Sequence, residues 1–195
     1  RNIQIYKGSS RLKGVTISQQ APVTQKYTSS SDLLINIPLS EARDEGPNHF
    51  EITNSGVTFK TDVSLNGKPV AYFDGNSYLS FSYIVGEEIS SGDLTVEWWE
   101  YPLSGSNCRF CSIGTSNVYS GLLLGYNGTQ LYAGGASNSW NIVSGATAFR
   151  NTLNSWTHWA VVRHNNVFKT YRNGYLFYTG ATNTTSLYWN NTYNC

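Results

Sequence analysis

Residues 93–102 read DLTVEWWEYP, and they decide the fold class of this chain. Leu94, Val96 and Trp98 alternate with the polar and aromatic residues that occupy the odd positions from 95 to 101. Successive side chains of a β-strand point to opposite faces, so this pattern places three apolar side chains together on one face. Thr, Val and Trp also favour pleated strands. The stretch therefore predicts a strand over residues 93–101, in the central part of a sheet.

The same alternation continues on both sides of this strand, interrupted by turn signals. Strands are predicted over residues 155–164 and 167–173, and Asp74-Gly75-Asn76 predicts a turn with a short strand on each side. Tight hairpins are predicted at Asn127-Gly128, Asn165-Asn166 and Asn173-Gly174. About a dozen short strands with no useful helical stripe indicate an all-β fold, an antiparallel two-sheet β-sandwich with less than about 10% helix.

The composition of the chain agrees with this fold class. Of its 195 residues, 14% are aromatic and 13% are charged, and the charged fraction of an average soluble domain is about twice as high. The formal net charge of +1 leaves no basic footprint for nucleic acid. No apolar stretch is long enough for membrane insertion. The chain contains no Met, which predicts that Arg1 is an internal position of a longer protein.

Three stretches carry a resemblance to a known family. They are YFDGNSYLSF at 72–81, GDLTVEWWEYPL at 92–103 and NSWTHWAVVRHNNVFKTYRNGYLFYTG at 154–180. In order and spacing they resemble the core of laminin-G-like (concanavalin A-like) jelly-roll domains, and the resemblance covers residues 32–180. It implies a jelly roll over residues 32–195.

The N-terminus carries a second resemblance. RNIQIYKGSSRLKG at 1–14 is similar to the closing strand, with its tail, of such domains repeated in structural and tail proteins of tailed phages, cyanophages especially. This implies that residues 1–31 are the closing strand of a preceding repeat plus a linker, and that residues 32–195 form a sandwich lacking its own last strand. Either residues 1–8 pair with the sheet of this domain, in the same chain or donated by a neighbour, or they belong to a previous repeat. The resemblance also implies a virion-surface or extracellular location, with neighbouring repeats or subunits as partners.

The superfamily of this fold includes glucanases, which need two carboxylates on one face of a strand. The nearest pair in this chain is Glu97 and Glu100. Their spacing of three sends the two carboxylates to opposite faces. No enzymatic activity is therefore expected, and a glycoside hydrolase remains a distant alternative.

The residues that bind metals elsewhere show only weak patterns in this chain. Cys108 and Cys111 have the spacing of half a zinc site, but no second pair of ligands accompanies them, and Cys195 stands alone. Asp74 and Asp93 are expected to cap turns, although calcium at the rim of the sandwich is an alternative. No metal and no cofactor are expected. His158, which has no partner motif, is expected to be a packed histidine.

Aromatic residues remain as candidates for a binding surface, because six Trp and 14 Tyr are more aromatic residues than one hydrophobic core normally contains. Flat rings flanked by amide side chains bind sugars, since the apolar face of the sugar stacks on the ring and its hydroxyls meet the amides. The candidate glycan-binding residues are Trp99, Tyr119, Tyr126, Tyr132, Trp140 and Trp189. The predicted function is adhesion to a glycan or cell-surface receptor. The alternative is a structural spacer, in which these rings cover the core or contact neighbouring subunits.

Overall fold

A computed structural model describes residues 3–7, 33–81, 92–105, 110–113, 121–136, 138–150 and 152–188. Fourteen strands and no helix are found in this part of the chain. Among the same residues, no helix is long and apolar enough to cross a membrane. The strands are β1 (Ile3–Lys7), β2 (Leu33–Ile37), β3 (Ile52–Ser55), β4 (Thr58–Leu65), β5 (Lys68–Tyr72), β6 (Tyr78–Phe81), β7 (Leu94–Glu100), β8 (Cys111–Ile113), β9 (Gly121–Tyr126), β10 (Gln130–Gly134), β11 (Val143–Thr147), β12 (Thr157–His164), β13 (Val167–Arg172) and β14 (Tyr175–Thr182).

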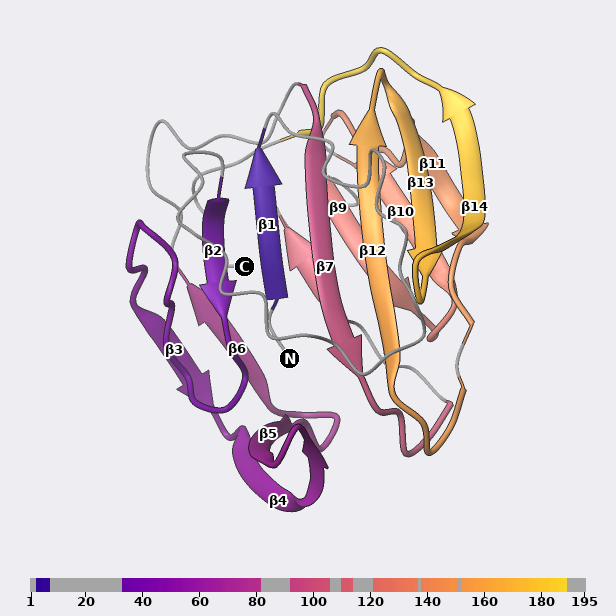
Figure 1. Ribbon diagram of the computed structural model, residues 1–195. Coiled ribbons are helices and arrows are strands. Elements are labelled where there is room, and N and C mark those ends of the chain that lie inside the picture. Colours follow the sequence, from indigo (N-terminus) through magenta and orange to yellow (C-terminus); the bar gives the residue numbers. More distant parts are fainter. Residues whose placement is uncertain are drawn as a thin grey trace.

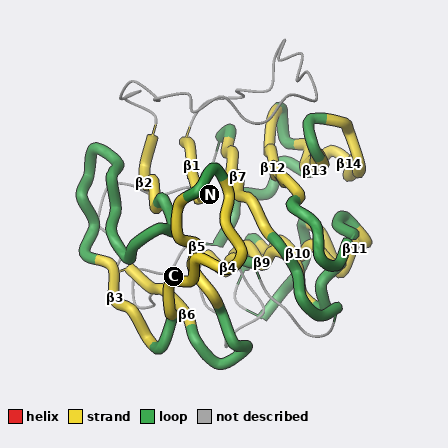
Figure 2. Tube along the Cα trace, turned by 60° about the horizontal axis from the view of Figure 1, so that its bottom comes forward, coloured by secondary structure: helices red, strands yellow, loops and turns green. Residues whose placement is uncertain are grey.

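Two antiparallel sheets face each other and form the predicted sandwich. One has six strands in the order β14-β13-β12-β7-β1-β2, and the other has four in the order β11-β10-β9-β8. Figure 1 shows the larger sheet in front of the smaller one, and Figure 2 shows the two layers from another side. The all-β, two-sheet fold class predicted from the alternation is confirmed.

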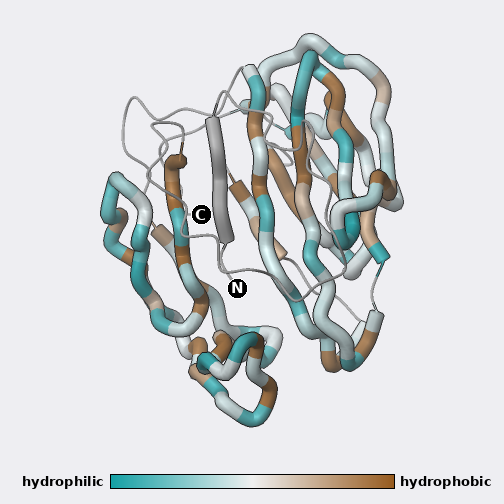
Figure 3. The backbone as a smooth tube through the Cα atoms, in the orientation of Figure 1, coloured by the Kyte–Doolittle hydropathy of each residue, from teal (hydrophilic) through white to brown (hydrophobic). Residues whose placement is uncertain are grey.

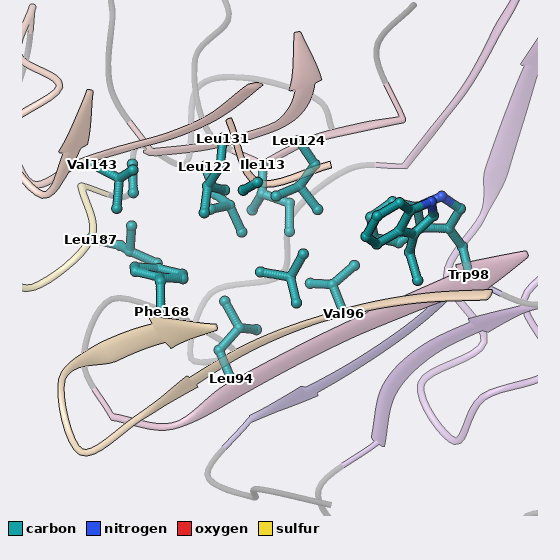
Figure 4. Packing of buried hydrophobic residues seen from close by; sticks show 14 of the residues in the cluster. Leu94, Val96, Trp98, Ile113, Leu122, Leu124, Leu131, Val143, Phe168 and Leu187 are labelled. Carbon is teal, nitrogen blue, oxygen red and sulfur yellow. The ribbon is translucent and has the colours of Figure 1, made fainter. Parts of the chain in front are cut away.

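The core lies between the sheets and receives apolar side chains from both. Leu94, Val96 and Trp98 of β7 are 1%, 0% and 5% exposed, so the face predicted to be apolar is the buried one. Figure 4 shows these three side chains pointing toward those of the smaller sheet, among them Leu122 and Leu131. In Figure 3, hydrophobic residues, coloured brown, occur along β2 and β12 and along the strands of the smaller sheet behind them. Burial of this apolar surface from both layers is the main stabilising term of such a fold.

The three predicted hairpins are confirmed, and their backbone conformations give the reason. β9 pairs with β10, β12 with β13, and β13 with β14, all antiparallel. At each turn both central residues have positive φ, as at Asn127 (51°) and Gly128 (72°). Two residues separate the paired strand ends at Asn165-Asn166 and Asn173-Gly174, and three separate them at 127–129. Such tight turns follow the twist of the strands, and Asn and Gly adopt positive φ most easily.

Strand β1 lies inside the larger sheet, between β2 and β7. Gln4 and Ile5 are paired with Glu97 and Val96 of β7, and Ile5 is also paired with Ile35 of β2. The chain therefore supplies this strand to its own sheet, which is one of the alternatives that the sequence left open. That residues 1–31 derive from a preceding repeat stays a prediction.

The turn at Asp74-Gly75-Asn76 differs from a simple hairpin. Strands flank it as predicted, but β5 pairs with β4 and β6 pairs with β3. The two strands therefore belong to different small sheets, and the turn carries the chain from one to the other. Phe81 of β6 stacks on Phe50, with ring centroids 5.5 Å apart, and both pack against the core.

The segment after β14 crosses from the larger sheet to the smaller one. Arg163 of β12, only 1% exposed, donates hydrogen bonds from one guanidinium nitrogen to the carbonyls of Asn183 and Thr185, at 3.3 and 2.6 Å. The backbone N–H of Tyr188 then donates to the carbonyl of Gly134 in β10, at 2.8 Å. These contacts hold residues 183–188 across one end of the sandwich.

Candidate functional site

Three of the predicted glycan-binding residues lie together on the outer face of the four-stranded sheet. Tyr126 ends β9, Tyr132 lies in β10, and Trp140 precedes β11. The rings of Tyr126 and Tyr132 are 5.8 Å apart between centroids and nearly perpendicular, and those of Tyr132 and Trp140 are 5.3 Å apart and tilted by 51°. All three residues are half-buried. We call these three residues the outer aromatic cluster.

The alternation of β10 explains why this cluster faces outward. Leu131 and Ala133, both 0% exposed, enter the core, so Gln130 and Tyr132 take the opposite face. Leu123 of β9, paired with Tyr132, is half-buried on the same face. None of these outward side chains is buried, so solvent reaches this face of the sheet.

Gly145 in β11 makes room for the central ring. Its φ is +69°, and a Cβ atom added to it would lie 2.9 Å from Tyr132 Oη and 3.1 Å from Tyr132 Cζ. The register of β10 and β11 shifts between Leu131 and Ala133, so Gly145 lies at a bulge. A glycine within a strand commonly marks a bulge or a close approach, and this signal in the sequence points to the site.

Replacement of Gly145 by Ala is expected to lower the free energy of unfolding by about 2 kcal/mol, because it combines backbone strain with a contact against the Tyr132 ring. Gly67→Ala is the matched control, since Gly67 has a similar φ of +70° but no atom within 4 Å of an added Cβ. Urea denaturation of both variants separates the two contributions. Equal losses in the two variants would show that Tyr132 does not rest on Gly145.

Polar groups lie beside the rings, and sequence reasoning did not single them out. Tyr132 Oη donates a hydrogen bond to Gln130 Oε1 at 3.1 Å. Thr147, opposite Gln130 in the ladder, is exposed, as is Asn141 next to Trp140. Amide and hydroxyl groups therefore surround the aromatic surface, which suits the hydroxyls of a carbohydrate. Their positions follow from strand pairing and not from any local motif.

Trp99 lies on a different face, away from the outer aromatic cluster. It projects from the outer side of the six-stranded sheet and packs on His158 of β12, with ring centroids 5.1 Å apart. His158 Nε2 is 3.7 Å from Glu97 Oε2. On the same face Thr95 and Ala160 are 1% and 0% exposed. Trp99 is half-buried, as are the three rings of the cluster, so its role in glycan binding stays a prediction. The packing predicted for His158 is confirmed.

The remaining predicted residues fall in two groups. Tyr119 and Trp189 lie outside the described residues, so their positions relative to the cluster stay predictions.

The two glutamates lie on opposite faces of β7, as predicted. Glu97 is beside His158 on the outer face of the larger sheet. On the inner face, Glu100 Oε1 accepts a 2.9 Å hydrogen bond from Nε1 of the buried Trp159.

The candidate metal ligands are engaged in other contacts. The backbone N–H groups of Asn76 and Ser77 donate to Asp74 Oδ1, and these bonds hold the pKa of Asp74 below its usual value. Asp93 contacts His164 Nδ1 at 2.5 Å. Within the described ranges, no three His, Cys, Asp or Glu side chains gather as a metal site would require. Asp74 therefore caps its turn, as predicted.

The three candidate cysteines cannot be compared with one another in space. Cys111 begins β8 and packs against the core. Cys108 and Cys195 lie outside the described residues, so the prediction that the cysteines hold no zinc stays a prediction.

Comparison with known proteins identifies the family. Residues 73–195 match the Laminin_G_3 family model, described as the concanavalin A-like lectin/glucanases superfamily. No curated protein and no solved structure matches the chain significantly. The match covers β6 to β14, including the whole four-stranded sheet, while β1 to β5 precede it. More than half of the chain is matched, and the chain therefore belongs to the laminin G-like family of the concanavalin A-like lectin/glucanases superfamily.

Proposed function

We propose that the chain is a non-enzymatic carbohydrate-binding module and that it binds glycans through the outer aromatic cluster. Membership of the superfamily supports a carbohydrate-binding or structural module. One observation supports binding in particular: three aromatic side chains lie side by side on a solvent-facing sheet surface, outside the core. The sheet's other large rings, Phe110 and Phe149, pack on Trp98 inside.

The geometry of the cluster fits this role. Its rings are perpendicular or tilted to one another, so they present both faces and edges to a ligand. A sugar stacks its C–H groups on a ring face, while its hydroxyls exchange hydrogen bonds with amide and hydroxyl groups such as those of Gln130 and Thr147. Gly145 and the hydrogen bond from Tyr132 to Gln130 hold the central ring in place.

Tyr132→Ala is expected to weaken glycan binding at least about tenfold, because a stacked ring contributes on the order of 1.5 kcal/mol. Tyr132→Phe should retain most of the affinity, since it keeps the ring and loses only the hydrogen bond to Gln130. Isothermal titration calorimetry with the best ligand from a glycan array measures both. Tyr175→Ala, which removes an exposed tyrosine of β14, is the matched control. Unchanged affinity in Tyr132→Ala, or loss of affinity in Trp99→Ala, would place the site elsewhere.

The proposal includes the absence of hydrolysis. Its support is the placement of Glu97 and Glu100 on opposite sides of β7, since a retaining or inverting pair must flank one glycosidic bond. The oligosaccharide used for the titration should be recovered uncut after prolonged incubation. Release of reducing ends that stops in Glu97→Gln would contradict the proposal.

A structural spacer is the second candidate function, favoured by the edge strand β14. Its Tyr175 and Leu176 are 65% and 57% exposed, and exposed apolar side chains on a sheet edge suit contacts with neighbouring subunits. Absence of binding to every member of the glycan array would favour the spacer.

For either function we propose display on a virion or cell surface. The support is the resemblance of residues 1–14 to the repeats of phage structural proteins. Tandem copies of the motif in the full-length parent protein would support this location, and a parent without repeats would contradict it.

A further inference from the structure

The four-stranded sheet is built from a stretch of sequence without any charged residue. Residues 110–149 contain no Asp, Glu, Lys, Arg or His. At the overall charged fraction of 13%, these 40 residues would hold about five charged ones (0.13 × 40). The stretch includes β8, β9, β10 and β11 and all three residues of the outer aromatic cluster.

Residues 183–188, which cross from β14 to this sheet, are also uncharged. No charged residue or histidine occurs in residues 173–195. Within them, Asn183 Nδ2 donates to the carbonyl of Asn141 at 2.9 Å, and Tyr188 is bonded to Gly134. This segment of the same chain thus adds amide and hydroxyl groups to the surroundings of Trp140, but no charged group.

The outer face of the six-stranded sheet is different. It carries Glu97 and His158, which lie 3.7 Å apart, and Lys169, whose neighbour across the ladder is Val162. The charged groups of the two sheets are therefore segregated: they lie on the larger sheet and are missing from the sequence of the smaller one.

The lack of charge in these four strands, which Arg109 and Arg150 flank in sequence, bears on which sugars the outer aromatic cluster holds. A carboxylate or sulfate that leaves water needs a cation or several strong donors to compensate for its lost hydration. The strands of the smaller sheet contain no such cation. Neutral sugars need only an apolar ring face and ordinary hydrogen-bond partners, which Tyr132, Gln130 and Thr147 provide.

We infer that the outer aromatic cluster is selective for neutral glycans and discriminates against uronic, sialylated and sulfated ones. This inference rests on the proposed function, because it specifies the ligand of that same surface. Binding would then be driven by stacking and neutral hydrogen bonds, which salt does not screen, unlike the ion pairs that hold an anionic glycan.

The test uses the full chain and pairs of neutral and anionic probes: lactose with 3′-sialyllactose, and fully methyl-esterified oligogalacturonate with oligogalacturonate. The neutral member of a pair is expected to bind at least about tenfold more tightly than its anionic partner. Its affinity should change by less than about twofold when NaCl rises from about 50 to about 500 mM. Thr147→Lys, which adds a cation beside Gln130, should selectively increase the affinity for the anionic members.

The outcomes separate the inference from the proposed function. Equal or tighter binding of the anionic members, lost on raising salt and in Tyr132→Ala, would overturn the neutral selectivity while the carbohydrate-binding function stands. Absence of binding by every neutral and anionic probe, in a broad array as well as in these pairs, would overturn the proposed function itself. Neutral binding that disappears in Trp99→Ala but persists in Tyr132→Ala would overturn the assignment to this sheet.

Discussion

A chain without residues 1–8 is expected to unfold at a melting temperature at least about 10 °C below that of the full chain, or not to fold at all. In the six-stranded sheet β2 has β1 as its sole neighbour, and β1 joins it to β7. Removal of β1 therefore leaves β2 unpaired together with its buried side chains, Leu33, Leu34, Ile35 and Ile37. Each exposed side chain of this size costs about 1.5–3 kcal/mol, and each kcal/mol lowers the melting temperature of a domain this large by about 2–4 °C.

Point variants of the full chain provide the control for this deletion. Ile5→Pro removes a backbone donor from a strand with partners on both sides and should destabilise the domain strongly. Ile5→Val keeps the backbone and the strand preference and should behave nearly as the wild type. A synthetic peptide of residues 1–8 should restore part of the lost stability to Ile5→Pro. If the deletion and Ile5→Pro both melt within about 2 °C of the wild type, β1 is not part of the fold.

The fold was predictable where local residues determine the structure. The Asn-containing turns are one example, because a residue pair that adopts positive φ fixes a two-residue hairpin without help from the rest of the chain. The strand over residues 94–100 is another, since its alternation decides which side is buried. The pairing at Asp74-Gly75-Asn76 was not predictable: a turn signal shows that the chain changes direction, but not which strands become partners. That choice depends on distant contacts such as Phe50 with Phe81.

The candidate site was predictable in its residue types but not in its arrangement. Tyr126, Tyr132 and Trp140 stand out as aromatics among Gly, Asn and Ser, and they are neighbours in space. Trp99 has the same residue type, but it packs on His158 from a strand far along the chain. Only the strand order shows that Trp99 lies on the other sheet, away from these three rings. Gly145 is a local signal of the site that the sequence analysis did not use. It lies against the Tyr132 ring, which leaves no room there for a Cβ atom.

The second large effect is expected in the dependence of the free energy of unfolding on pH. The carboxyl group of Glu100 and the imidazole of His158 change this free energy in opposite directions as pH rises. Burial raises the pKa of Glu100 to about 7, although Trp159 Nε1 donates a hydrogen bond to it. Burial lowers the pKa of His158 to about 4. Between about pH 4.5 and 7 the folded state retains a proton on Glu100 that the unfolded state releases, so stability falls as pH rises. Between about pH 4 and 6.5 the unfolded state binds a proton on His158 that the folded state does not, so stability falls as pH drops.

Each group contributes a slope of at most about 1.4 kcal/mol per pH unit, and the two slopes have opposite signs. In wild type they largely cancel between about pH 4.5 and 6.5. Glu100→Gln, which retains an acceptor for Trp159, should remove one slope and become more stable than the wild type by up to about 3 kcal/mol at pH 8, relative to their difference at pH 4. His158→Phe, which retains a ring against Trp99, should remove the other and leave a stability that falls from pH 4.5 to 7.

Urea denaturation at half-unit steps of pH measures these profiles, and Glu51→Gln, at an exposed position, is the control that should follow the wild type. Glu100 Oε2 is buried without a hydrogen-bond partner in the described part of the chain, which is why an ionised carboxylate is costly there. A Glu100→Gln profile parallel to that of wild type from pH 4.5 to 8 would show that this carboxyl group is solvated in the folded state. Glu100 would then not lie against Trp159 inside the sandwich, and the separation of the two glutamates by β7 would have to be abandoned with it.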